Sequence, residues 1–149
     1  RLKQLIDNKD LKGFHNIYSM SSNLLSGFNN HFEEFLDSVY NVFPDDTDVL
    51  ASKNLLKQMR SANPKMIINI WKTNIVDKYY HEIEKGDISF FINKDYSDDL
   101  ENMNASNKIL DGINRLRDPI KSMGDTNQKI AMKFIQNLSK ITKVYFSSQ

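Results

Sequence analysis

Apolar residues recur at steps of three and four along most of this 149-residue chain. The clearest stretch spans residues 22–43, where the spacing is kept by Leu24, Leu25, Phe28, Phe32, Phe35, Leu36, Val39 and Phe43. Such steps place side chains on one face of an α-helix, whereas a half-buried strand would alternate apolar and polar residues. The periodicity therefore predicts an all-α fold, in which helices bury their apolar stripes against one another.

Turn and capping residues divide this pattern into segments. The predicted helices cover residues 22–43, 48–60, 63–85, 106–123 and 125–146. Pro44 ends the first because proline cannot continue the backbone hydrogen bonding. Asn63 and Pro64 are expected to start the third as its N-cap and first helical residue. Gly86 is its expected C-terminal cap, and Pro119 should kink the fourth helix or split off its last turn.

The remaining stretches are shorter. Residues 1–20 are expected to form a short helix and a loosely organised arm, interrupted at Gly13. The apolar run 88–92 favours one or two helical turns over a strand, because no second strand is in view to pair with it. Asp125 or Thr126 should cap the last helix. We expect one domain over residues 1–149, with a compact bundle of about five or six helices and short connections over 22–146.

Composition excludes several classes of site. Cysteine is absent, so the chain has no disulfide, thiolate zinc site or cysteine nucleophile. No apolar run approaches the roughly 18–20 residues of a membrane span. The net charge is +1, but acids outnumber bases in residues 77–101 and bases outnumber acids after residue 101. This polarity could orient docking subunits, and it is also ordinary for a solvated helical surface.

No histidine arrangement has the spacing of a metal or catalytic site. His15, His31 and His81 are far apart in the sequence. His81-Glu82 resembles the start of a zincin motif, but no histidine follows four residues after His81. The chain also lacks a glycine-rich phosphate loop and a nucleophile elbow.

Two oxygen-rich stretches have some features of cation sites. The loop 93–99 places oxygen ligands on alternate residues, but Asp98 stands where a calcium loop needs glycine and Asn104 where it needs glutamate. Asp45, Asp46 and Asp48 are better explained as caps of the second helix. We therefore expect no enzymatic activity, no catalytic residue, no metal, no cofactor and no small-molecule substrate.

Two groups of residues are candidates for binding a macromolecule. The first is a basic group on the polar side of the last helix, which could track phosphates but could equally be a solvated face: Lys129, Lys133, Lys140 and Lys143. The second is an aromatic group, because aromatic residues anchor interfaces as well as cores: Trp71, Tyr79, Tyr80, Phe90 and Phe91.

A block over about residues 32–100 resembles a known group of proteins. It contains Phe43-Pro44-Asp45, Asn63-Pro64, Trp71, Val76, Tyr79, Ile83, Gly86-Asp87 and Phe90-Phe91. This block is similar to uncharacterised helical proteins of nucleocytoplasmic large DNA viruses, of the mimivirus-like and algal-virus-like groups. A bias toward Lys, Asn and Ile agrees with an A/T-rich genome of that kind. The resemblance implies a minor capsid protein or other virion component, assembled in the host cytoplasm.

These observations favour a non-enzymatic structural or interaction protein that bridges larger subunits, with capsid or assembly proteins as partners. A first alternative is a viral nucleic-acid-associated protein that uses the C-terminal lysines. A second is an intracellular regulator that binds a partner protein through a helical groove.

Overall fold

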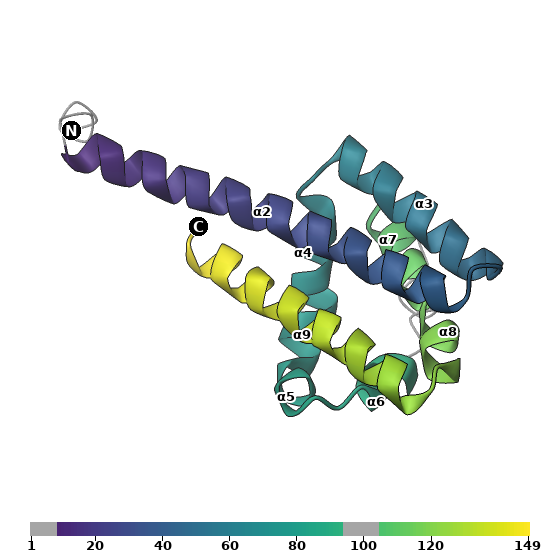
Figure 1. Ribbon diagram of the computed structural model, residues 1–149. Coiled ribbons are helices and arrows are strands. Elements are labelled where there is room, and N and C mark those ends of the chain that lie inside the picture. The colour runs from purple at the N-terminus through teal and green to yellow at the C-terminus, as the bar shows by residue number, and fades with distance from the viewer. Residues whose placement is uncertain (1–8, 94–104) are drawn as a thin grey trace.

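The computed structural model describes residues 9–93 and 105–149, with side chains for 20–93 and 107–149. Every regular element in these residues is a helix, which confirms the predicted all-α fold (Figure 1). The elements are α2 Lys9–Val42, α3 Thr47–Ala62, α4 Met66–Trp71, the π-helix η1 Lys72–Val76, α5 Asp77–Lys85, α6 Ser89–Asn93, α7 Ala105–Asn114, α8 Arg117–Ser122 and α9 Asp125–Ser147.

The two longest helices, α2 and α9, lie side by side and run in opposite directions (Figure 1). At one end, Gln149 Nε2 donates a 3.2 Å hydrogen bond to Ser21 Oγ. Nearer the middle, the rings of His31 and Phe134 have centroids 4.8 Å apart. Because α9 ends opposite Ser21, residues 9–20 of α2 extend past it, over about 18 Å at the helical rise of about 1.5 Å per residue.

The start of α2 differs from the prediction. The helix begins at Lys9 rather than near residue 22, so the expected interruption at Gly13 is wrong. One glycine costs a helix only about 1 kcal/mol relative to alanine, which a helix of 34 residues tolerates. Residues 1–8 of the predicted arm lie outside the described residues.

The segment 66–85 crosses behind the α2–α9 pair and forms the centre of the core (Figure 1). Trp71 is fully buried. Its ring meets Phe28 and Phe32 edge-on, at centroid distances of 6.5 and 5.4 Å, and its Nε1 donates a 3.1 Å hydrogen bond to Ser139 Oγ on α9. Apolar residues cover a wide arc of this segment, as is typical of a helix that contacts several neighbours at once.

A π-helical turn in this segment was not predicted. Within it, Asn74 Nδ2 donates to the Ile70 carbonyl at 3.2 Å, and Thr73 Oγ1 donates to the Asn69 carbonyl at 3.2 Å. A π turn accommodates one extra residue, and such side-chain bonds support the carbonyls that the wider turn leaves poorly bonded.

Two predicted caps are confirmed. Asp46 is the N-cap of α3, and its Oδ1 accepts from the backbone N–H groups of Asp48 and Val49 at 2.9 and 3.0 Å. Gly86 ends α5 in the left-handed region, with φ of 75°, which suits a residue without Cβ. Helix α6 confirms the prediction of a helical turn rather than a strand after Gly86.

Two other predicted caps are wrong. Asn63 is the C-cap of α3: its backbone is extended and its N–H donates to the Met59 carbonyl, so it closes α3, and α4 begins only at Met66. Helix α9 begins at Asp125, as predicted, but Gly124 stands at the N-cap position and no side chain caps the helix.

The predicted helix 106–123 is split, as Pro119 suggested. Helix α7 ends at Asn114 and α8 begins at Arg117, which puts Pro119 in the first turn of α8. There its missing N–H costs no hydrogen bond, while its ring keeps the carbonyl of Arg115 out of the helical ladder. Helices α6 and α8 pack together at the end of the molecule where α9 begins (Figure 1).

Candidate interaction surface

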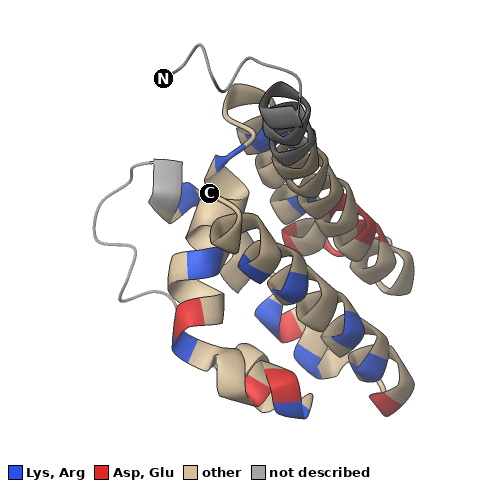
Figure 2. Ribbon diagram, turned by 90° about the vertical axis from the view of Figure 1, so that its left-hand side faces the viewer, with Lys and Arg blue, Asp and Glu red and all other residues tan. Residues whose placement is uncertain are grey.

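The outer face of α9 is the most uniformly charged helix surface that the structure describes. After Asp125 the helix has no Asp or Glu, and four exposed lysines follow along it: Lys129, Lys133, Lys140 and Lys143. At about 100° per residue these positions share one side of the helix, and 14 residues cover about 21 Å of its axis. Figure 2 shows the blue segments spaced along α9.

The four lysines are not equivalent. Lys143 Nζ lies 3.4 Å from the centroid of the Tyr80 ring on α5, in a cation–π contact. The other three form no ion pair with any residue that the structure describes. The structure therefore joins one member of the predicted basic group to one member of the predicted aromatic group, and leaves Lys129, Lys133 and Lys140 directed toward solvent.

An open groove of about 470 Å³ lies beside these lysines, between α2 and α9. Its lining comes from α2 as Gly27, Asn30, His31 and Glu34, and from α9 as Asn137, Lys140 and Ile141. A Cβ built on Gly27 would meet no atom within 4 Å. The glycine therefore widens the groove at this point.

His31 closes one part of this groove. Its Nδ1 lies 3.2 Å from Glu34 Oε2, and its ring packs on Phe134. Its Nε2 is buried and has no hydrogen-bond partner among the described residues. The imidazole ring of His31 therefore forms part of the groove wall, and its contact with the Glu34 carboxylate lies at the α2 edge of the groove.

Three exposed aliphatic side chains lie on α2 and α9 outside the groove lining. Met20, Ile130 and Val144 are 44, 45 and 48% exposed. On α9, Ile130 and Val144 stand seven residues before and after Asn137, and this spacing places all three on the edge facing α2. Ile130 is exposed because its direction lies well away from the centre of the buried stripe of α9. The fourth strongly exposed apolar side chain, Leu50, lies on α3 and is 42% exposed.

The aromatic candidates do not form one surface. Trp71 and Phe91 are fully buried, which makes them core residues. Tyr79 and Phe90 are half-buried and stack on each other with centroids 5.0 Å apart, while Tyr80 lies under Lys143. Burial removes Trp71 and Phe91 from any surface, and of the five residues Tyr80 contacts the lysine row of α9 through Lys143.

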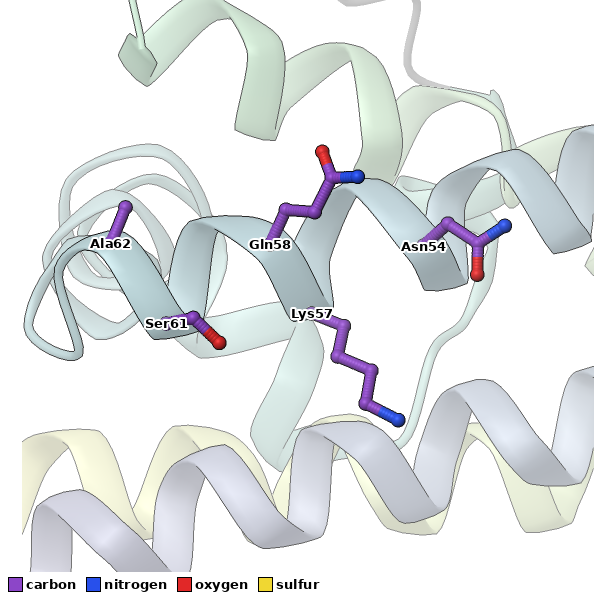
Figure 3. Close-up of a pocket in the computed structure, with 5 residues that line it drawn as sticks. All are labelled: Asn54, Lys57, Gln58, Ser61 and Ala62. Atoms are coloured by element: carbon purple, nitrogen blue, oxygen red, sulfur yellow. The ribbon is translucent and has the colours of Figure 1, made fainter.

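The other large hollow lies on the outside of α3 and has a volume of about 640 Å³. All of its lining residues come from this one helix: Asn54, Lys57, Gln58, Ser61 and Ala62. Figure 3 shows that they splay apart, with Gln58 and Lys57 pointing in opposite directions. No set of these polar groups converges on a point where a small ligand could be held.

The perturbed titratable groups belong to helix ends and surface pairs. Hydrogen bonds from the Ser89 side chain and backbone lower the pKa of Asp87, which precedes α6. The hydrogen bond and charge of Asp111 raise the pKa of Arg115, with a further contribution from Asp48. Local structure explains both pKa shifts, because hydrogen bonds and nearby opposite charges stabilise the ionised form of each group.

Two of the remaining candidate residues, His81 and Asp48, lie on helices other than α2 and α9. His81 is exposed on α5, and Asp48 pairs with Arg115 at 3.1 Å. The side chain of His15 and residues 94–99 of the predicted loop lie outside the described residues. In the described part, no three His, Asp or Glu side chains gather closely enough to hold a metal ion. None of the described helices is both long and apolar enough to cross a bilayer.

The α2 side of the groove was not found from the sequence. Gly27, Asn30 and Glu34 occur on a helix whose apolar stripe dominates its pattern, and nothing in their spacing points to α9. For the α9 side the sequence does contain a signal, because no acidic residue follows Asp125 on that helix.

Comparison of the chain with protein-family models, with curated proteins and with solved structures gives no match.

Proposed function

We propose that this chain is a non-enzymatic interaction protein that docks onto another protein subunit through the outer face of α9. The single observation that supports this most directly is the row formed by Lys129, Lys133 and Lys140. These side chains are exposed and have no ion pair with the residues that the structure describes. A partner that brings carboxylates to this face would satisfy all three.

The alignment of these lysines on one helix face, and not the absence of ion pairs alone, sets the row apart. Lys53 pairs with Asp37 at 2.7 Å, Arg60 with Glu33 at 2.6 Å, and Arg115 with Asp48, but the exposed Lys57 and Lys121 also have no ion pair with the described residues. On α9, Lys129 and Lys133 stand four residues apart, a spacing at which like charges destabilise an isolated helix by about 0.2–0.5 kcal/mol. Acidic groups of a partner would offset this repulsion.

The resemblance to large DNA virus proteins gives the proposal its specific form. In that form the partner is a capsid or assembly protein, and the chain is a minor virion component that bridges larger subunits. The long α2 and the exposed α9 offer extended helical faces to such partners, as a bridging protein requires. This form of the proposal predicts a constant ratio of the chain to the major shell protein.

Lysine-reactive labelling read by mass spectrometry tests the proposal. Purified particles are labelled natively, and the isolated chain is labelled under the same conditions. We expect Lys129, Lys133 and Lys140 to be protected in particles, whereas Lys57, exposed on α3, serves as the matched control. Equal labelling in both samples would reject α9 as the docking face. Absence of the chain from particles washed with salt and detergent would reject the virion role.

Nucleic-acid binding is the second candidate, favoured by the same row of lysines. A helix with aligned lysines can neutralise successive phosphates, and each neutralised phosphate adds about −0.9 to the slope of log K against log salt concentration. Three lysines would give a slope of about −2.7 with duplex DNA. Changing Lys133 to alanine should then make this slope less steep by about 0.9, the contribution of one phosphate contact. A slope near zero would exclude this candidate.

A further inference from the structure

We propose that the groove between α2 and α9 binds an acidic amphipathic helix of the partner protein. The inference rests on the proposed function and specifies the chemistry of the partner. A third helix laid along this groove would pack against both α2 and α9. Recognition of this kind joins an apolar stripe to a groove floor and charged flanks to the rims.

Exposed aliphatic residues would provide the apolar contacts for a partner helix. Of the four large apolar side chains most exposed among the described residues, three lie on the two helices that form the groove: Met20 on α2, and Ile130 and Val144 on the edge of α9 that faces α2. Ile141, half-buried, lies between the two from α9 in the groove wall. Aliphatic side chains in line with a groove are poor contacts for phosphates but good ones for the apolar stripe of a helix.

Charged residues on the α9 and α2 rims of the groove would set the orientation of the partner helix. On the α9 rim, Lys133 and Lys140 are exposed, and no acid follows Asp125 on that helix. On the α2 rim, the groove is lined by Asn30 and by Glu34, the latter in contact with His31. The rims therefore specify an orientation: the partner's acidic flank lies over α9, and a basic residue of the partner meets Glu34.

The dimensions of the groove suit a helix. The groove lining covers residues 27–34 of α2, which is about 10 Å or two helical turns. At Gly27 open space lies where a side chain would project. The α9 edge from Ile130 to Val144 is longer, about 21 Å, so a partner helix of four to five turns would fill the groove over about two turns and contact the α9 edge over the rest.

The test uses the full chain and a fluorescein-labelled synthetic peptide of about 20 residues, with leucine at heptad a and d positions, glutamate at e and lysine at g. Its acidic flank can then face α9 while its basic flank faces Glu34. Binding is followed by fluorescence anisotropy, and we expect saturable 1:1 binding. A peptide with lysine in place of every glutamate should bind at least about tenfold more weakly, because its contacts with Lys133 and Lys140 become like-charge contacts.

Variants locate the site. Lys133→Glu combined with Lys140→Glu should weaken binding of the acidic peptide about tenfold, while Lys57→Glu combined with Lys65→Glu, the same charge change at two exposed lysines outside α9, should leave binding unchanged. Gly27→Leu should abolish binding by filling the groove, and Val144→Ser should weaken it about fivefold through lost apolar contact. Helical circular dichroism checks that each variant is folded.

Three outcomes overturn the inference. They are absence of saturable peptide binding, peptide binding that Gly27→Leu leaves intact, and self-association of the chain through this groove in sedimentation experiments. Tighter binding of a 20-base-pair DNA duplex that ignores Gly27→Leu and Val144→Ser would assign the lysines to nucleic acid. The proposed function fails separately: unprotected lysines in native particles reject it even if the peptide binds. Protected lysines with no peptide binding reject only the helical partner.

Discussion

Trp71 on α4 and Ser139 on α9 are joined in the core by a hydrogen bond of 3.1 Å from the indole Nε1 to the serine Oγ. Both side chains are almost completely buried. Ser139 Oγ in turn donates to the Ile135 carbonyl at 2.7 Å. This short chain of hydrogen bonds joins the central helix to the helix that bears the lysines.

Ser139→Ala should lower the free energy of unfolding by about 1–3 kcal/mol, because the indole N–H is left buried without an acceptor. Urea unfolding followed by the fluorescence of Trp71, the single tryptophan, measures the change. Ser147→Ala, an exposed change on the same helix, is the control and should stay within about 0.5 kcal/mol of the parent. Equal effects of the two substitutions would contradict this role for Ser139.

Lys143 should differ from Lys140 in its contribution to stability. Lys143→Gln removes the cation–π contact with Tyr80 and should cost about 0.5–1 kcal/mol. Lys140→Gln removes a charge that has no described partner, and should be neutral or slightly stabilising. The two variants are compared in the same urea experiment. A loss at Lys140 as large as that at Lys143 would show that the Tyr80 contact contributes nothing measurable.

Glycine substitutions should have opposite signs at two positions. Gly86→Ala should destabilise the chain by about 1 kcal/mol or more, since an L-residue at φ of 75° is strained. Gly27→Ala should stabilise it by about 0.5–1 kcal/mol, because Gly27 lies within α2 and its Cβ would meet open space. Thermal unfolding by circular dichroism gives both values. Stabilisation by Gly86→Ala would disprove the left-handed cap.

The stabilising effect of Asp87 should depend on pH. The Ser89 hydrogen bonds lower its folded pKa below the ordinary value of 3.8. The contribution is therefore fully present above that value and is lost as pH falls through the lower folded pKa. The stability difference between the parent chain and Asp87→Ala should thus be larger at pH 7 than at pH 2. An NMR titration of the Asp87 carboxyl group checks the cause directly, and a midpoint at or above 3.8 would refute it.

Local signals in the sequence determined the helices and most of the core. Steps of three and four identified the buried faces of α2 and α9, and Pro44, Pro119 and Gly86 marked true ends, because their backbone constraints act within a few residues. The same local reasoning failed at Gly13, Asn63 and the π turn. There the outcome depends on how a neighbouring segment packs, and one residue's propensity of about 1 kcal/mol or less is easily overridden.

Sequence also determined that α9 has a lysine-rich face without acids after Asp125, since both properties follow from composition and helical period. Only the tertiary structure decided what lies beside that face. It buried Trp71 and Phe91, drew Lys143 to Tyr80, and set Gly27 and Glu34 of α2 opposite Lys140 and Ile141. The physical reason is that a groove joins residues more than 100 positions apart, and their proximity arises from antiparallel packing of two helices that neither helix encodes alone.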